Sequence, residues 1–214
     1  MTEKVIFISG IGTNVGKSYA TGWLANYLKS SGLRVITQKM IQTGNAEYSE
    51  DIDVHRKVMG MPYCEDDTNH TTAPVILSYP ASPHLAAIID NREIDMAAID
   101  NSTAILSQKY DTVLIEGAGG LMVPIKDFYL TIDYVAERGY PVALVTNGTL
   151  GSINHTILSI EALQRRGIRI AYVIYNSHFD EDKTISADTV EYIRRYVAKF
   201  APDAKFLVMP SIGK

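Results

Sequence analysis

The stretch SGIGTNVGKS, residues 9–18, decides the fold, and its spacing raises a question. It ends in Gly-Lys-Ser, as a phosphate-binding loop does, and in that pattern four residues separate a first glycine from the final one. The position where this first glycine belongs holds Ile11, and the nearest glycines, Gly10 and Gly12, stand one residue too early and one too late. The stretch is therefore either a phosphate loop with one extra residue or a turn that contains Gly-Lys-Ser by chance.

Short apolar runs alternate with longer amphipathic runs along the rest of the chain. The patterns predict strands at 5–9, 34–38, 112–115, 141–146, 168–175 and 206–209, helices at 17–31, 51–59, 82–89, 95–108, 131–138, 151–166 and 184–200, and a loop over 60–80. Strands that are nearly continuous apolar runs are typical of a parallel sheet covered on both faces. We therefore predict an α/β fold, mainly a parallel sheet with helices on both faces, and a single domain over residues 1–214. If residues 9–18 are a phosphate loop, this fold is of the P-loop NTPase-like kind.

Composition narrows the possible partners. The formal net charge is -4 with no long basic run, so a nucleic-acid partner is not indicated. No apolar run is long enough to cross a membrane, and no secretory leader pattern is present. The single cysteine, Cys64, excludes an internal disulfide framework, so we expect a cytoplasmic location.

Residues 9–18 lie between the first predicted strand and the first predicted helix, where a phosphate loop must lie. There, backbone N–H groups and the helix N-terminus attract an anion, Lys17 can reach the β- and γ-phosphates, and the Ser18 hydroxyl can bind Mg²⁺. Magnesium also needs a carboxylate, and Glu116 supplies one at the end of an apolar strand. Asp53 is a further candidate, although an acid there also suits a helix N-terminus by itself. Lys39 follows the second predicted strand and is either a site lysine or a solvated one.

The chain is similar to the dethiobiotin synthetase family over nearly its whole length. The resemblance includes Gly10 to Ser18, since the family's phosphate loop has five residues between its first glycine and Gly-Lys-Thr/Ser. It continues through Lys39, Thr43 and Asp53, then the blocks Pro-Ala-Ser-Pro-His at 80–84, Glu-Gly-Ala-Gly-Gly at 116–120 and Gly-Ser-Ile-Asn-His at 151–155, and Asn176. The resemblance implies that the extra residue is native to the loop.

It also implies an activity: ATP- and Mg²⁺-dependent formation of dethiobiotin from 7,8-diaminopelargonate and CO₂, via a carbamate and a carbamic-phosphoric anhydride. Carried over by position, the catalytic residues are Lys39, Lys17 and Thr13, and the metal is bound by Ser18, Asp53 and Glu116. Nucleotide-binding residues are Gly12, Thr13, Asn14, Val15, Gly16, Lys17, Ser18, Asp53, Glu116 and Asn176; substrate-binding residues are Thr43, Gly119, Gly120, Gly151, Ser152, Ile153 and Asn154. The family implies a homodimer with its sites at the interface.

Some positions differ from the family pattern. Asn14 stands where some members carry an acid, Ser18 replaces a more usual threonine, and the chain stops at Lys214, so we expect loose purine recognition. His55, His70 and His178 are expected at the surface, with some room for a nucleotide contact at His55.

Two other functions remain as alternatives, an amide synthase on the same fold and a regulatory switch ATPase. Loops of the partition type of switch ATPase carry an extra lysine near their start, which residues 10–12 lack. A GTPase is disfavoured because residues 146–149 lack the Asn-Lys-x-Asp guanine motif.

Overall fold

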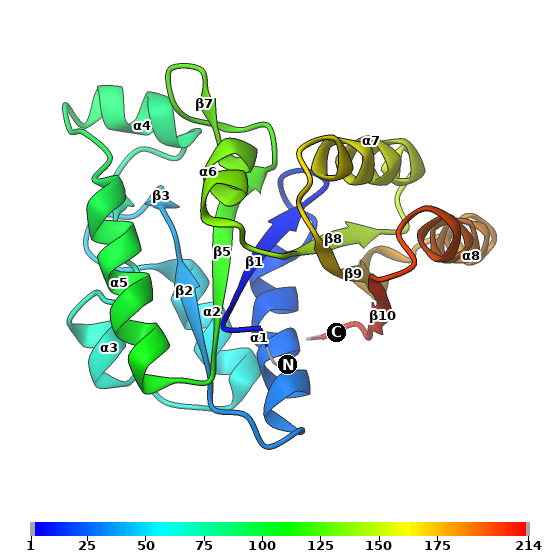
Figure 1. Ribbon diagram of the computed structural model, residues 1–214, viewed down its shortest axis with the longest axis horizontal. Helices are drawn as coiled ribbons and strands as arrows, with labels where there is room; N and C mark the ends of the chain where they lie inside the picture. Colours follow the sequence, from blue (N-terminus) through cyan, green and yellow to red (C-terminus); the bar gives the residue numbers. More distant parts are fainter. Residues whose placement is uncertain (1–2, 213–214) are drawn as a thin grey trace.

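The computed structural model describes residues 3–212. Its centre is a sheet of six parallel strands in the order β10-β9-β8-β1-β5-β2 (Figure 1). The strands are β1 (Val5–Gly10), β2 (Val35–Lys39), β5 (Thr112–Gly120), β8 (Val142–Asn147), β9 (Ile170–Asn176) and β10 (Lys205–Met209). The predicted parallel sheet is confirmed.

Helices cover both faces of this sheet, as expected (Figure 1). Alternate residues of β1 enter two different cores: Ile6 and Ile8 pack with α1 and α2, whereas Phe7 packs with the helices of the opposite face. The helices are α1 (Lys17–Lys29), α2 (Glu50–Met59), α3 (Glu65–Thr68), α4 (Pro83–Ile89), α5 (Met96–Lys109), α6 (Thr131–Arg138), α7 (Ser152–Arg165) and α8 (Lys183–Phe200). Among residues 3–212, none of them is both long and apolar enough to span a bilayer.

The structure differs from the sequence prediction mainly in short elements. Residues 60–80, expected to be a loop, contain α3 and the strand β4 (Ile76–Leu77), which pairs with β3 (Gln42–Thr43). The hairpin of β6 (Pro124–Lys126) and β7 (Tyr129–Leu130) was also not predicted, nor was the single turn η1 (Ser177–Phe179). These segments are too short for a periodic pattern, and partners distant in sequence hold α3 and β4.

The C-terminal ends of the sheet strands meet at one edge. Strand β5 continues past its predicted end at residue 115, and its Gly120 pairs with Gly10 of β1. Lys39 and Glu116 are also register partners, on β2 and β5. In open α/β sheets this edge is where ligands bind.

Candidate active site

The phosphate loop joins β1 to α1 and uses Gly10 as its first glycine. A Cβ on Gly10 would come within 2.5 Å of Val15 Cγ2, whereas one on Gly12 would meet nothing within 4 Å. Asn14 and Gly16 have positive φ angles, 59° and 84°, the left-handed conformation that a nest of N–H groups requires. Five residues therefore separate the two glycines of the loop, which is the longer spacing expected from the sequence.

Four charged or hydroxyl side chains meet beside this loop. Ser18 Oγ lies 2.5 Å from Asp51 Oδ1 and 3.1 Å from Glu116 Oε1. Lys39 Nζ lies 2.6 Å from Asp51 Oδ2 and 2.9 Å from Glu116 Oε1. The Lys39 ammonium also donates to the carbonyl of Gly117 at 3.3 Å. Lys39 is thus a buried site lysine and not a solvated one.

The acid that lies beside Ser18 and Lys39 is Asp51 and not Asp53, which was expected there. Asp53 is exposed and accepts a hydrogen bond from the Tyr63 hydroxyl, away from Ser18 and Glu116. Two positions apart on a helix, side chains point about 200° apart, so only one of the two acids can face the site. One sequence signal was available, because Asp51 stands four residues before His55 and therefore shares its helix face.

His55 is fully buried, not at the surface as expected. Its Nε2 lies 2.6 Å from Glu116 Oε2, and Thr21 Oγ1 donates to the same oxygen at 3.3 Å. The other ring nitrogen, Nδ1, has no hydrogen-bond partner within residues 3–212. The sequence placed His55 beside an acid but could not show that α2 turns it inward.

Charge compensation differs between the two lysines. The pKa of Lys17 is lowered, mainly by burial. The Glu116 carboxylate acts to raise this pKa, and the Lys39 ammonium acts to lower it. Burial acts in the same direction on Lys39, but the carboxylates of Glu116 and Asp51 raise its pKa above the ordinary value. Burial also opposes ionisation of Glu116, yet Lys39 and His55 hold the pKa of this carboxyl well below its usual range.

Lys17 is the less compensated cation. Its Nζ donates to the Gly12 carbonyl at 3.0 Å, and within residues 3–212 it forms no ion pair. It is therefore free to bind an anion that enters the loop.

A cleft of about 870 Å³ opens over this cluster. Of the predicted site residues, it is lined by Thr13, Asn14, Gly16, Lys17, Ser18, Lys39, Thr43, Glu116, Gly119 and Asn176. The structure adds Asp51, the segment 80–83 and a far end formed by His178, Phe179, Met209 and Ile212. Residues 151–154 do not line the cleft, and neither do Gly12, Val15, Asp53 and Gly120.

Comparison with known proteins identifies the family. A family model described as an AAA domain matches residues 4–201. The chain is 48% identical over 210 residues to the ATP-dependent dethiobiotin synthetase BioD 2 of Pasteurella multocida, which covers 98% of this chain and 99% of that protein. It is also 48% identical over 200 residues to the ATP-dependent dethiobiotin synthetase BioD of Chlorobaculum tepidum, covering 94% of this chain and 84% of that protein. The chain belongs to the dethiobiotin synthetase family.

The fold is shared more widely than the family. A putative plasmid partition protein from Borrelia burgdorferi, solved with AMPPNP, superposes with a TM-score of 0.59 at 15% identity, covering 99% of this chain and 88% of that one. At that identity the likeness concerns the fold alone, and it confirms the expected P-loop NTPase-like architecture.

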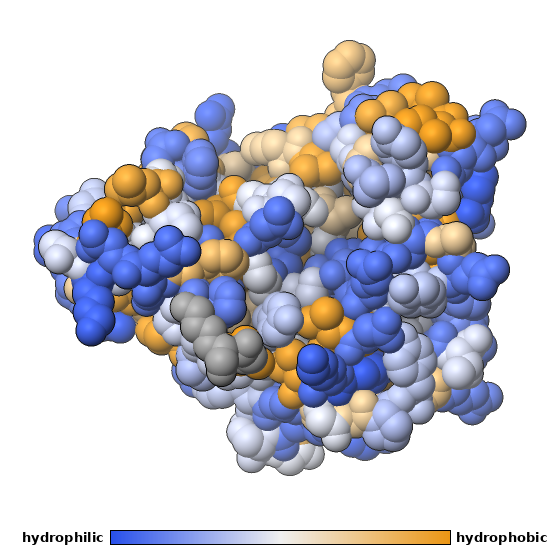
Figure 2. Space-filling view, turned by 180° about the vertical axis from the view of Figure 1, so that it is seen from behind, coloured by the Kyte–Doolittle hydropathy of each residue, from blue (hydrophilic) through white to orange (hydrophobic). Residues whose placement is uncertain are grey.

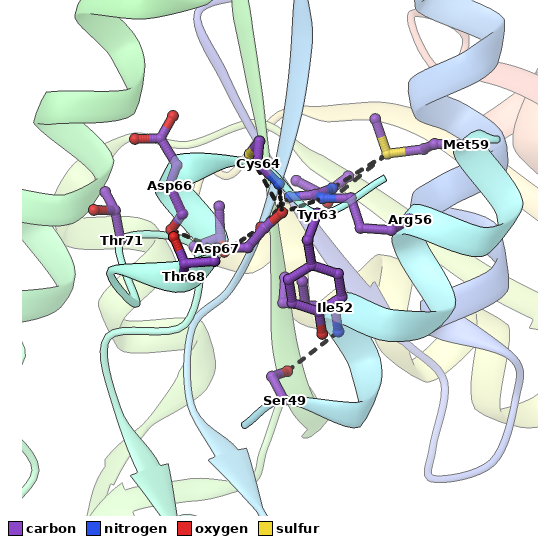
Figure 3. Close-up of polar contacts among 12 residues, drawn as sticks. Ser49, Ile52, Arg56, Met59, Tyr63, Cys64, Asp66, Asp67, Thr68 and Thr71 are labelled. Carbon is purple, nitrogen blue, oxygen red and sulfur yellow. Dashed lines mark hydrogen bonds and ion pairs between the residues drawn. The ribbon is translucent and has the colours of Figure 1, made fainter. Parts of the chain in front are cut away.

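In this dethiobiotin synthetase family member, a buried ion pair fixes the helix that carries Asp51 and His55. Arg56 of α2 makes two hydrogen bonds to Asp67 of α3, at 2.8 and 2.7 Å, as Figure 3 shows. It also donates to Thr37 of β2 at 2.8 Å, and at the start of α2 the Ser49 hydroxyl donates to Gln42 Oε1 of β3 at 2.6 Å. Both ends of α2 are thereby anchored, which sets its rotation toward the cleft.

Proposed function

We propose that this chain makes dethiobiotin from 7,8-diaminopelargonate, CO₂ and ATP. The observation that carries the proposal is the cluster of Lys17, Lys39, Ser18, Asp51 and Glu116 on the floor of one cleft, next to a phosphate loop. Its relatives from Pasteurella multocida and Chlorobaculum tepidum bear the name of that ATP-dependent synthetase. A switch ATPase would not need the pocket that extends from the loop to Thr43 and residues 80–83.

The reaction brings together anions that repel one another. One amine adds to CO₂ and loses a proton, which gives a carbamate. A carbamate oxygen attacks the γ-phosphorus and ADP leaves; the second amine then attacks the carbonyl carbon, phosphate leaves with the loss of another proton, and the ring closes. Lys17 and Lys39 offset the charge on the phosphates and the carbamate, and the cleft holds the second amine beside the anhydride.

The residues at the loop fit Mg²⁺. Ser18, Asp51 and Glu116 offer hard oxygen ligands, since Ser18 Oγ lies 2.5 Å from Asp51 Oδ1 and 3.1 Å from Glu116 Oε1. Residues 3–212 contain no cluster of three or more His, Cys, Asp or Glu side chains that could hold a metal alone. Two carboxylates and a hydroxyl suit Mg²⁺, which keeps several waters and shares its coordination with substrate phosphates. When bound, the ion neutralises charge on the transferring phosphoryl group.

The part of the cleft beside Gly16, lined by Asn176, His178 and Phe179, is a candidate base site. Asn176 Nδ2 donates to the Val15 carbonyl at 3.1 Å, and its Oδ1 accepts from His178 N at 3.1 Å. A Cβ on Gly16 would come within 2.3 Å of Asn176 Nδ2, so the loop and this amide are packed together. One proton and one lone pair of the amide remain for a purine.

The diamine's carboxylate needs a second subsite, and we place it at the start of α7 in a partner subunit. Residues 151–154 form the N-terminus of α7, where backbone N–H groups can bind an anion, although Ser152 N already donates to the Thr149 carbonyl at 3.1 Å. None of the four residues lines the cleft of its own chain. Three apolar side chains are strongly exposed: Leu150 beside these residues at 82%, Ile88 of α4 at 71% and Phe128 at 96%. Apolar side chains gather over α4 in Figure 2. Such exposed apolar groups favour a homodimer in which each chain completes the other's site.

The test is phosphate release with and without the diamine and bicarbonate, together with mass analysis for the cyclic urea. We expect release to depend on both substrates and on Mg²⁺, and Lys17→Ala to lower it about 10²–10³-fold because the loop loses its mobile cation. Release that is independent of the diamine would support the switch ATPase. Turnover of another amine with no cyclic urea would support the amide synthase.

A further inference from the structure

The two oxygens of the Glu116 carboxylate have different neighbours. Oε1 faces the loop and lies near Ser18 Oγ at 3.1 Å and Lys39 Nζ at 2.9 Å. Oε2 faces the inside of the protein and contacts His55 Nε2 at 2.6 Å and Thr21 Oγ1 at 3.3 Å. Only one oxygen is therefore directed toward the proposed cation position.

His55 is held rigidly where it meets Oε2. It lies on α2, which packs against α1 at Gly22, where a Cβ would come within 2.8 Å of Val58 Cβ and 3.1 Å of the His55 carbonyl oxygen. The next residue of the same helix, Arg56, is fixed by its ion pair with Asp67. Because Nδ1 has no partner in residues 3–212, the contact with Glu116 is the polar interaction that accounts for an imidazole at this buried position.

We propose that His55 is a positioning residue for Glu116. It donates from Nε2 to Oε2 and so leaves Oε1 as the oxygen that binds Mg²⁺. The inference rests on the proposed function, in which Glu116 is a metal ligand. Partners that hydrogen-bond a metal-binding carboxylate set its orientation, and removing such a partner typically costs 10–100-fold in metal affinity.

Three variants separate this role from simple packing. His55→Gln keeps an N–H donor at about the distance of Nε2, His55→Asn carries its donor only at the distance of Nδ1, and His55→Leu fills the space without a donor. Thr103→Val is the matched control, since it removes a buried hydroxyl that bonds Gln38 Oε1 at 2.9 Å on the opposite face of the sheet.

The readout is Mn²⁺ binding to the complex with a non-hydrolysable ATP analogue, followed by electron paramagnetic resonance, together with analogue affinity in EDTA. We expect His55→Asn and His55→Leu to weaken Mn²⁺ binding about 10–100-fold and His55→Gln to stay within about threefold of wild type. Analogue affinity in EDTA should be unchanged in all three. Thr103→Val should leave Mn²⁺ affinity unaltered.

Two further variants distinguish failure of this inference from failure of the metal site. If Ser18→Ala and Glu116→Gln weaken Mn²⁺ binding while His55→Asn does not, the role of His55 is wrong and the site stands. If Ser18→Ala and Glu116→Gln both leave Mn²⁺ binding unchanged, the metal site of the proposed function is wrong. Equal losses of Mn²⁺ affinity in His55→Gln and His55→Asn would show that the ring only packs. The comparison of these two variants is sufficient even if His55→Leu fails to fold.

Discussion

Asp51 and Asp53 share a helix but not a face, and this makes a sharp test of the site. Asp51→Asn should lower Mg²⁺-supported turnover about 10²-fold and raise the Mg²⁺ concentration for half-maximal rate. The reason is that one carboxylate, which is both the proposed metal ligand and the ion-pair partner of Lys39, loses its charge. Asp53→Asn should stay within about threefold, since its exposed carboxylate contacts only Tyr63 in the described chain. Turnover as a function of Mg²⁺ measures both. A larger loss in Asp53→Asn than in Asp51→Asn would show that Asp53 is the metal-binding acid.

Lys39 is placed to act on the chemical step more than on nucleotide binding. It lies between two carboxylates and the Gly117 carbonyl, on the floor of the cleft and beyond the loop's own lysine. Lys39→Ala should lower the single-turnover rate about 10²–10³-fold. A nucleotide titration should show a much smaller change. A large loss of nucleotide affinity with an unchanged chemical rate would contradict this role.

At the scale of elements, the Arg56–Asp67 pair makes α2 sensitive to acid. Burial alone would raise the pKa of Asp67, but the hydrogen bonds from Arg56 lower it to about 2. The unfolded value is about 3.9, so the pair's contribution is present above that pH and is lost as the pH falls from about 4 toward 2.

The matching variant is Asp67→Asn, which leaves the buried Arg56 guanidinium without its counter-ion. The free energy of unfolding at neutral pH should fall by about 3–5 kcal/mol. Between pH 4 and 2, stability should decline less steeply than in wild type. Denaturant titrations at several pH values measure both quantities. Parallel pH curves would mean that Asp67 does not titrate with folding.

Elements with a long repeating pattern could be predicted from sequence, and those fixed by distant partners could not. The unbroken apolar run of β1 predicts a strand that is buried on both faces, and Phe7 does enter one core while Ile6 and Ile8 enter the other. By contrast, α3 is one turn long and depends on Arg56 eleven residues away. The same limit applies to the site. The loop and Glu116 have local signatures. Choosing Asp51 over Asp53 required the rotation of α2, which the Arg56–Asp67 pair and packing against α1 set together.

At the scale of the whole molecule, the proposed dimer divides each site between two chains. The cleft contains the phosphate loop and the cation cluster, but the start of α7 lies outside it. The extended diamine is roughly 10 Å long by covalent geometry, so its carboxylate must reach beyond the loop. A partner's α7 can meet it only if the interface includes the start of α7, where Leu150 is exposed.

Mixing two inactive variants tests this arrangement. Ser152 is buried and bonds the Thr149 carbonyl, so a substitution there would disturb the helix start, whereas Asn154 is exposed. Asn154→Glu should repel the substrate carboxylate, and Lys17→Ala should disable the loop. In a mixed dimer one site then carries both defects and the other carries neither. Random exchange of equal amounts should restore about a quarter of wild-type turnover, because half of the dimers are mixed and each has one intact site. Mass spectrometry under native conditions confirms that mixed dimers form. If they form and turnover stays at the level of the separate variants, each site lies within one chain and the carboxylate subsite must be sought in the cleft near Thr43.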